Sequence, residues 1–226
     1  MQQVKNSSFD NGSRRKSQVT RLISFFKSKK YLEAKGLAKK ILEENPRHTL
    51  SWRIIGMIYM REKNYQKSVY AHQQVTLFSP KDSEAFYNLG LAQNSLGASE
   101  SAEASYKRAL EIKPEFWQAH YNLATIYKET NRCGAAVMHY EASVDYAPNS
   151  ADAHYGLGTA LFRLRKLDLA LESFNNAAHL RENFDLAISG QGQILMAKGL
   201  HKEGLEKLKS ADGVIRFDLE SGMTIV

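Results

Sequence analysis

Few side chains in this 226-residue chain stand in a spacing that could support catalysis or metal binding. The seven histidines are scattered, and the sequence contains no H-E-x-x-H, no G-x-S-x-G, no P-loop and no G-x-G-x-x-G that would open a helix after a strand. The single cysteine, Cys133, has no histidine or acidic partner set by the spacing, so a reactive thiol is not indicated. We therefore expect a protein that is not an enzyme and that holds no catalytic residue, cofactor or metal ion.

The composition is that of a folded domain in water. Hydrophobic residues make up 43% of the chain and charged residues 24%, which excludes a disordered protein. One cysteine excludes a disulfide framework. The longest apolar stretches, such as residues 54–60, are too short to span a bilayer, and the polar N-terminus lacks the apolar core of a secretory signal. These features favour a cytoplasmic location.

Positive charge is concentrated at the N-terminal end. Eleven of the 31 Lys and Arg residues lie in residues 1–40 together with only two acids, so this segment carries +9 and the rest of the chain −2. Such a basic head favours an acidic partner, a nucleic acid or an anionic membrane surface. A solvated surface without a partner is the simpler interpretation, and we do not expect nucleic-acid binding. The basic head is formed by Arg14, Arg15, Lys16, Lys27, Lys29 and Lys30.

The spacing of the prolines reveals an internal repeat. The four prolines of the chain are Pro46, Pro80, Pro114 and Pro148, each 34 residues after the one before. A fixed period of this length is typical of stacked structural repeats. We number the positions of each repeat from 1 to 34, starting at residues 15, 49, 83, 117, 151 and 185. Small residues dominate positions 20 and 27, and position 8 reads Leu22, Gly56, Gly90, Ala124, Gly158 and Gly192.

Two helices fit into each repeat. Positions 4, 7, 8 and 11 lie on one face of a first helix, and positions 20, 24 and 27 form the stripe of a second helix. Turn formers such as Gly97 separate the stripes, and the proline that closes the period stops the second helix. His120 and His154 fall at position 4, which holds large aromatic residues in other repeats, so we interpret them as packing residues. The pattern predicts an all-α chain with turns near residues 29, 63, 97, 131, 165 and 199.

The pattern closely resembles the tetratricopeptide repeat family. Residues 85–90 (AFYNLG) and 119–124 (AHYNLA) are similar to the first helix of that family, and the resemblance covers residues 15 to about 216 as six repeats. The terminal repeats depart from the pattern, since Arg21 and Gln191 replace the apolar residue at position 7. The resemblance implies an α-solenoid, a right-handed superhelix of helix–turn–helix repeats. In this family the first helices line a concave groove that binds peptides or proteins.

The resemblance also implies which positions face the groove, namely positions 5 and 6 among others. Asparagine amides at position 6 can pair with a peptide backbone, and tyrosines at position 5 offer rigid contact area. The clamp by which some relatives hold acidic chaperone tails is matched at only two of five positions, so we do not expect that ligand. The candidate ligand-binding residues are Arg53, Tyr87, Asn88, Tyr121, Asn122 and Tyr155.

The two ends of the chain differ from the repeats. Residues 1–14 are polar and without periodicity, so we expect a disordered basic tail ahead of a six-repeat array in residues 15–212. Residues 213–226 show a loose alternation of apolar and polar side chains around a Glu-Ser-Gly turn, which predicts a strand-like C-terminal tail. This tail could fold onto the last repeat, pair with another chain by strand addition, or lead into a further part of a longer protein.

The sequence thus favours a non-enzymatic scaffold that binds a peptide or partner protein in the concave groove. Self-association through the array ends or the C-terminal tail is a further expectation. One alternative is a recognition module ahead of a catalytic domain, because glycosyltransferases and sulfotransferases that resemble this layout carry such arrays. Another is binding of an acidic partner or nucleic acid through the basic head, which predicts a steep dependence of affinity on salt.

Overall fold

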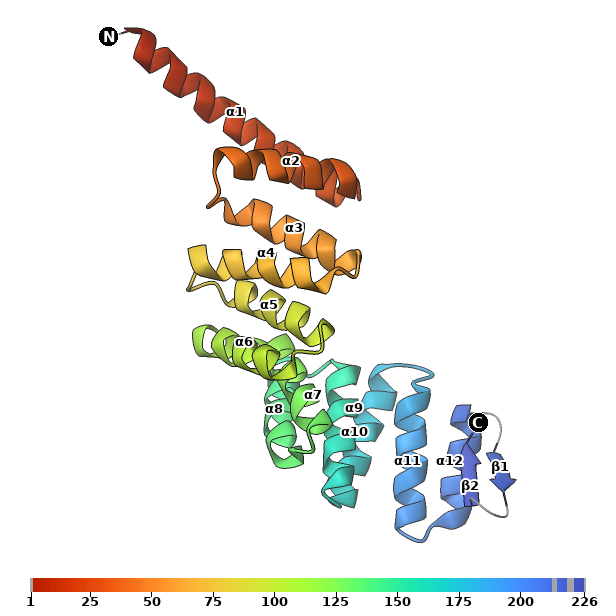
Figure 1. The fold of residues 1–226 in the computed structure, drawn as a ribbon. Helices are drawn as coiled ribbons and strands as arrows, with labels where there is room; N and C mark the ends of the chain where they lie inside the picture. The colour runs from red at the N-terminus through yellow and green to blue at the C-terminus, as the bar shows by residue number, and fades with distance from the viewer. Residues whose placement is uncertain (1, 213–214, 219–221, 226) are drawn as a thin grey trace. The chain divides into compact units, whose positions relative to one another are not determined.

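The computed structural model describes residues 2–212, 215–218 and 222–225, and its side chains are described from residue 15 to residue 211. Within these residues the chain forms twelve helices followed by two short strands (Figure 1). It divides into two compact units, residues 1–112 and 113–226. None of the helices in the described part is long and apolar enough to cross a membrane.

The helices of the first unit are α1 (Gln2–Lys27), α2 (Tyr31–Glu44), α3 (Thr49–Arg61), α4 (Tyr65–Phe78), α5 (Ser83–Ser95) and α6 (Ser99–Ile112). Those of the second unit are α7 (Trp117–Glu129), α8 (Cys133–Tyr146), α9 (Ala151–Arg163), α10 (Leu167–Leu180), α11 (Asp185–Ala197) and α12 (His201–Asp212). The two strands, β1 (Ile215–Asp218) and β2 (Gly222–Ile225), close the second unit.

The helix boundaries repeat with the 34-residue period. The first helices α3, α5, α7, α9 and α11 each begin at position 1 and are 13 residues long. The second helices α2, α4, α6, α8, α10 and α12 each begin at position 17. Within each unit, a second helix packs against the first helix of its own repeat and against the first helix that follows. The predicted all-α solenoid of helix–turn–helix repeats is confirmed.

A residue in the left-handed region follows the first helix of every repeat. Position 15 has a φ between 56° and 84° in all six repeats, including three where it is lysine or arginine. In the third repeat the N–H of Gly97 donates to Asn94 O and the N–H of Ala98 donates to Gln93 O, both at 2.9 Å. These bonds use carbonyls that the end of a helix leaves unpaired. The turns therefore lie where the sequence predicts them.

The loop between repeats is held by the ring at position 4. The Trp52 indole N–H donates to the carbonyl of Pro46 at 2.7 Å. His120 and His154 make the equivalent bond through Nε2, at 2.9 and 3.0 Å, to the proline carbonyl six residues before each of them. These histidines are packing residues whose polar edge fixes the preceding loop, and their Nε2 atoms are committed to that bond.

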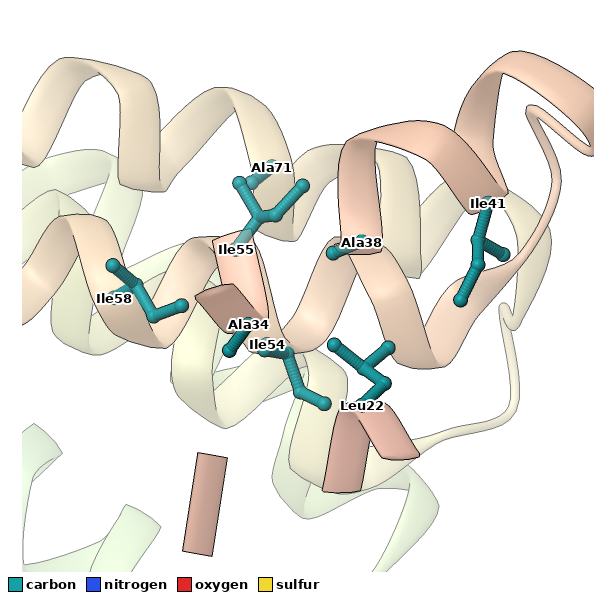
Figure 2. Close-up of a cluster of buried hydrophobic side chains, with 8 residues drawn as sticks. All are labelled: Leu22, Ala34, Ala38, Ile41, Ile54, Ile55, Ile58 and Ala71. Carbon is teal, nitrogen blue, oxygen red and sulfur yellow. The ribbon is translucent and has the colours of Figure 1, made fainter. Parts of the chain in front are cut away.

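A buried apolar cluster joins the first four helices. Alanines at three of its positions let neighbouring helices approach closely, while leucine and isoleucine fill the space between them. Leu22, at position 8 of the first repeat, is fully buried and holds the C-terminal part of α1 in the stack. Figure 2 shows the cluster, which consists of Leu22, Ala34, Ala38, Ile41, Ile54, Ile55, Ile58 and Ala71.

The N-terminal end differs from the expected disordered tail. Residues 2–14 continue α1 as helical backbone in the structure. Once packing has formed the C-terminal turns of α1, each added residue gains a backbone hydrogen bond, and only the first turn of a helix carries the full cost of nucleation. Polarity and missing periodicity therefore do not prevent residues 2–14 from extending a helix that packing has already started.

At the C-terminal end β1 and β2 pair in antiparallel fashion, with Ile215 opposite Ile225 and Phe217 opposite Met223. Residues 213–214, 219–221 and 226 of the expected tail lie outside the described residues. The division of the chain into a tail, an array and a strand-like end stays a prediction.

The turn geometry can be tested at Gly97, where φ is +84° and an added Cβ would meet nothing within 4 Å. We expect Gly97→Ala to lower the free energy of unfolding by about 1 kcal/mol, because an alanine in the left-handed region is strained although the space is open. The control is Gly36→Ala, since Gly36 lies in the middle of α2 and also has open space around its Cα. That variant should gain about 0.5–1 kcal/mol. Equal stabilities of the two variants in urea denaturation would contradict the assigned turn.

Candidate functional site

The candidate groove residues are divided between the two units. All six side chains are half-buried: Arg53, Tyr87 and Asn88 lie in the first unit, and Tyr121, Asn122 and Tyr155 in the second. The strip of three tyrosines therefore stays a prediction. Within the second unit α7 contacts α9 and α9 contacts α11, so the first helices of three repeats lie side by side. We call the surface that carries Tyr121, Thr125, Asp152 and Tyr155 the first-helix face.

Each tyrosine of the first-helix face rests on an aromatic ring of the second helix in its own repeat. The Tyr121 ring meets Tyr140 edge-on with 5.8 Å between centroids, and the Tyr155 ring lies 5.7 Å from Phe174. Tyr155 also contacts Phe184 at 5.3 Å. Tyr140 and Phe174 both occupy position 24 and are buried. The tyrosines thus have fixed rings, which suits them to present their hydroxyl groups without much loss of conformational entropy.

Hydroxyl groups converge beside Tyr121. Thr125 Oγ1 donates to the carbonyl of Tyr121 at 3.0 Å and lies 3.0 Å from the hydroxyl of Tyr140, which then donates to it. Burial raises the pKa of the Tyr121 phenol, and the nearby Asp152 carboxylate raises it further, while Arg181 acts in the opposite direction. Burial also raises the pKa of Tyr140. Both phenols are therefore neutral near pH 7 and can donate or accept hydrogen bonds.

An ion pair borders the hydroxyl groups. Arg181 Nη2 lies 2.6 Å from Asp152 Oδ2, and this hydrogen bond is the main cause of the raised pKa of Arg181. Both side chains are about half exposed, so the pair contributes at most about 1 kcal/mol to stability. Its two charges remain accessible to a ligand. A hollow of about 490 Å³ adjoins the pair and is lined in part by Trp117, Pro148 and Leu180.

The asparagine at position 6 is less open than the sequence indicates. Asn122 donates through Nδ2 to the carbonyl of Gln118, one turn earlier in α7, at 3.0 Å. Position 6 of the next repeat is Gly156, and a Cβ there would lie 2.4 Å from the Tyr140 ring. This position therefore faces the preceding repeat as well as the groove side. Asn122 remains a candidate for ligand binding, but its amide already has an internal partner.

In the first unit, Arg53 is not a free cation. Its guanidinium forms ion pairs with Asp82 and with Glu84, the latter at 2.9 Å. Tyr87 packs against Tyr106 with 5.9 Å between ring centroids, in the same relation as the tyrosines of the second unit. The position-5 arginine is thus neutralised by the protein itself, which makes it a poor candidate for holding an acidic ligand.

His72 occupies position 24 of the repeat that contains Arg53, where the next three repeats have Tyr106, Tyr140 and Phe174. The His72 side chain is 1% exposed, and its Nδ1 has no hydrogen-bond partner in the described part of the protein. Burial lowers the pKa of His72 to about 4, and the positive charge of Arg53 contributes to this shift. The imidazole is therefore a neutral packing group near pH 7.

The basic head is exposed to solvent. Arg15 and Lys16 on α1 and Lys27, Lys29 and Lys30 around its C-terminus are all exposed, while the side chain of Arg14 lies outside the described set. Among the residues that the structure describes, no group of three His, Cys, Asp or Glu side chains is placed to hold a metal ion. Cys133 is buried at the start of α8.

Comparison with known proteins points to one repeat family. Residues 83–116 and residues 121–185 match models described as tetratricopeptide repeat. A comparison with curated proteins gave no match. Among solved structures, MamA from Desulfovibrio magneticus RS-1 is similar with a TM-score of 0.68 and 22% identity, over 72% of this chain and 92% of that one. YrrB, described as a TPR protein with an unusual peptide-binding site, has a TM-score of 0.69 and 18% identity, over 78% and 91%. At these identities the likeness shows the fold.

The buried imidazole makes stability depend on pH. The folded-state pKa of His72, about 4, lies below its ordinary value of 6.5. The stability that depends on a neutral His72 is therefore fully present above pH 6.5 and is lost as the pH falls toward 4. The loss should amount to roughly 3 kcal/mol at most. We expect His72→Phe to remove most of this dependence and to raise stability at pH 7, because the unpaired Nδ1 disappears. His48, whose pKa burial also lowers, accounts for a remainder.

Urea denaturation at pH 7.5 and pH 4.5 measures the effect. The matched control is His179→Phe, which makes the same replacement at an exposed position of α10. A pH dependence that is the same in His72→Phe and in the unmodified chain would show that His72 is not the buried titrating group.

Proposed function

Because this chain is a tetratricopeptide repeat protein, we propose that it is a non-enzymatic interaction scaffold whose first-helix face binds an extended segment of a partner protein. The observation that carries the proposal is the fixed polar surface of the second unit. There, Tyr121 and Tyr155 stand on buried rings, and the Asp152–Arg181 pair lies beside them. YrrB, whose fold this chain shares, is described as having a peptide-binding site.

The chemistry of the first-helix face suits a peptide backbone. Neutral phenols both donate and accept, as the amide groups of an extended chain require. The ring surfaces of the two tyrosines supply apolar contact, and their fixed positions reduce the entropy lost on binding. The hollow beside Asp152 and Arg181 offers an apolar wall at Trp117 and Leu180 and two charges at its edge, so it could select one side chain of the ligand.

The basic head supports a second candidate site. Its five described cations are exposed and lie on α1 and the turn that follows. An acidic partner held there would be bound mainly through charge, and its affinity would fall steeply with salt. A ligand on the first-helix face, held by hydroxyl groups and rings, would show a weaker salt dependence. The two sites can therefore be separated by the salt dependence of binding.

The test begins with dodecapeptides selected on the full chain from a random display library. We expect the double variant Tyr121→Phe, Tyr155→Phe to weaken the selected peptides about tenfold, because each lost hydrogen bond contributes about 0.5–1.5 kcal/mol. The rings remain on Tyr140 and Phe174, so the melting temperature should hardly change. Fluorescence anisotropy gives the Kd values. A second variant, Asn88→Ala with Asn122→Ala, shows whether the position-6 amides take part.

The control for the tyrosine variants is Tyr146→Phe, since Tyr146 is 51% exposed on α8 and lies outside the first-helix face. It should leave the affinities unchanged.

A third variant replaces Lys27, Lys29 and Lys30 with glutamine. If only this variant weakens binding, and the Kd rises steeply between 50 mM and 300 mM salt, the basic head is the binding site and the first-helix face is not.

A further inference from the structure

A second concave surface lies in the first unit, between the second helices α2 and α4 with the first helix α3 beneath them. It has a volume of about 540 Å³ and a mostly apolar lining. This volume falls within the range of about 300–1,000 Å³ that ligand sites occupy. It lies in the other unit from the first-helix face and shares no residue with it. The residues that line this α2–α4 groove are Lys39, Leu42, Glu43, Trp52, Ile55, Tyr59, Lys67, Tyr70 and Ala71.

The floor and one wall of the α2–α4 groove are held in place. Ile55 and Ala71 belong to the buried cluster of the first four helices (Figure 2). The Trp52 indole is tied through Nε1 to the carbonyl of Pro46, and Tyr70 meets the indole edge-on with 5.7 Å between centroids. Tyr70 remains 57% exposed. Fixed aromatic surface that stays in contact with water is typical of the anchor pockets of protein interfaces.

The rim of the α2–α4 groove is positive. Lys39 and Lys67 are exposed, and neither has a carboxylate partner within the described residues. Lys67 Nζ lies 5.8 Å from the centroid of the Tyr59 ring. Lys35 Nζ lies 4.3 Å from the same centroid and also forms an ion pair with Glu62. Glu43 is the one acid among the lining residues. The groove therefore offers an apolar floor between cations.

The surrounding sequence reinforces this charge. Residues 15–67 contain fourteen Lys and Arg against four Glu. By contrast, residues 113–226 hold twelve basic and fourteen acidic side chains, so the second unit offers no strongly acidic counterpart. A second copy of this chain would thus bring little complementary charge to the groove. A partner with excess negative charge is favoured both at the contact and during the approach.

We propose that the α2–α4 groove binds an acidic peptide segment that carries a bulky apolar side chain. The apolar side chain packs against Trp52 and Tyr70, and carboxylates on either side of it meet Lys39 and Lys67. The chain then has two binding surfaces of different chemistry, one in each unit. Such a protein can hold two partners, or two segments of one partner, at once.

The experiment uses the full chain with Trp117→Phe, so that Trp52 is the one tryptophan and its emission reports on the groove. Dodecapeptides are selected on it from a random display library and titrated individually. We expect a class of peptides in which Asp or Glu flank Trp, Phe or Leu, and which shift the Trp52 emission. The double variant Lys39→Glu, Lys67→Glu should weaken this class at least about tenfold. Tyr70→Ala should weaken it by a similar factor.

The matched control is the double variant Lys40→Glu, Lys81→Glu, which makes the same total charge change at two exposed positions of the first unit that do not line the groove. It should alter the Kd no more than about threefold. Tyr121→Phe with Tyr155→Phe should leave this peptide class unaffected, so the outcome is independent of the first-helix face. Circular dichroism and melting curves establish that each variant is folded.

Four outcomes would overturn the proposal. The selected peptides could lack the acidic and apolar pattern, or they could bind Lys39→Glu, Lys67→Glu as tightly as they bind the control Lys40→Glu, Lys81→Glu. Alternatively, sedimentation could show a dimer of the chain that Tyr70→Ala dissociates, in which case the groove is occupied by a second copy. A dodecathymidylate that shifts the Trp52 emission where no acidic peptide does so would assign the groove to nucleic acid.

Discussion

The fold depends on the contact between a buried side chain at position 24 of each second helix and the small residues that face it. Phe174 shows the full arrangement. A Cβ at Gly158, in the same repeat, would lie 2.8 Å from its ring, and a Cβ at Gly190, in the next repeat, would lie 2.7 Å from it. The ring therefore fixes both the hairpin and the stacking of consecutive hairpins. Gly56 with His72 and Gly192 with Leu208 repeat the contact within a hairpin, so the 34-residue period follows from a steric requirement.

The same contact prepares the surface that we propose for binding. A ring that is locked between two glycines offers its remaining edge to the tyrosine at position 5, as Phe174 does to Tyr155. Function and stability are therefore coupled, because a change that loosens position 24 also frees the tyrosine that stands on it. His72 is the exception, since an imidazole fills this place in the repeat of Arg53 and makes that repeat sensitive to acid. The two units thus differ in chemistry although they share one architecture.

Much of the fold could be predicted from the sequence, because steric constraints repeat at fixed positions. The period, the turns at position 15 and the small residues at position 8 needed only the spacing of Pro, Gly and Ala. Less of the candidate site could be predicted from the sequence. Arg53 is neutralised by Asp82 and Glu84, which lie 29 and 31 residues away in the sequence. No spacing rule predicts such ion pairs. Thr125 and Asp152 carried a weak signal, since they stand at positions 9 and 2, which also face the groove in the family that the sequence resembles, whereas Arg181, at position 31, carried none. The α2–α4 groove is formed by three helices, so it exists only once they are packed.

A double-mutant cycle between Gly158 and Phe174 tests whether the ring at position 24 requires glycine on the facing helix. The free energy of unfolding is measured in urea for Gly158→Ala, Phe174→Ala and the double variant. We expect Ala at position 158 to destabilise the chain beside Phe174 but to be tolerated beside alanine at position 174, which lacks the ring atoms that a Cβ at position 158 would meet, with a coupling energy of about 1 kcal/mol or more. Effects that add to within about 0.3–0.5 kcal/mol would show that the two residues are independent and that the ring does not require the glycine.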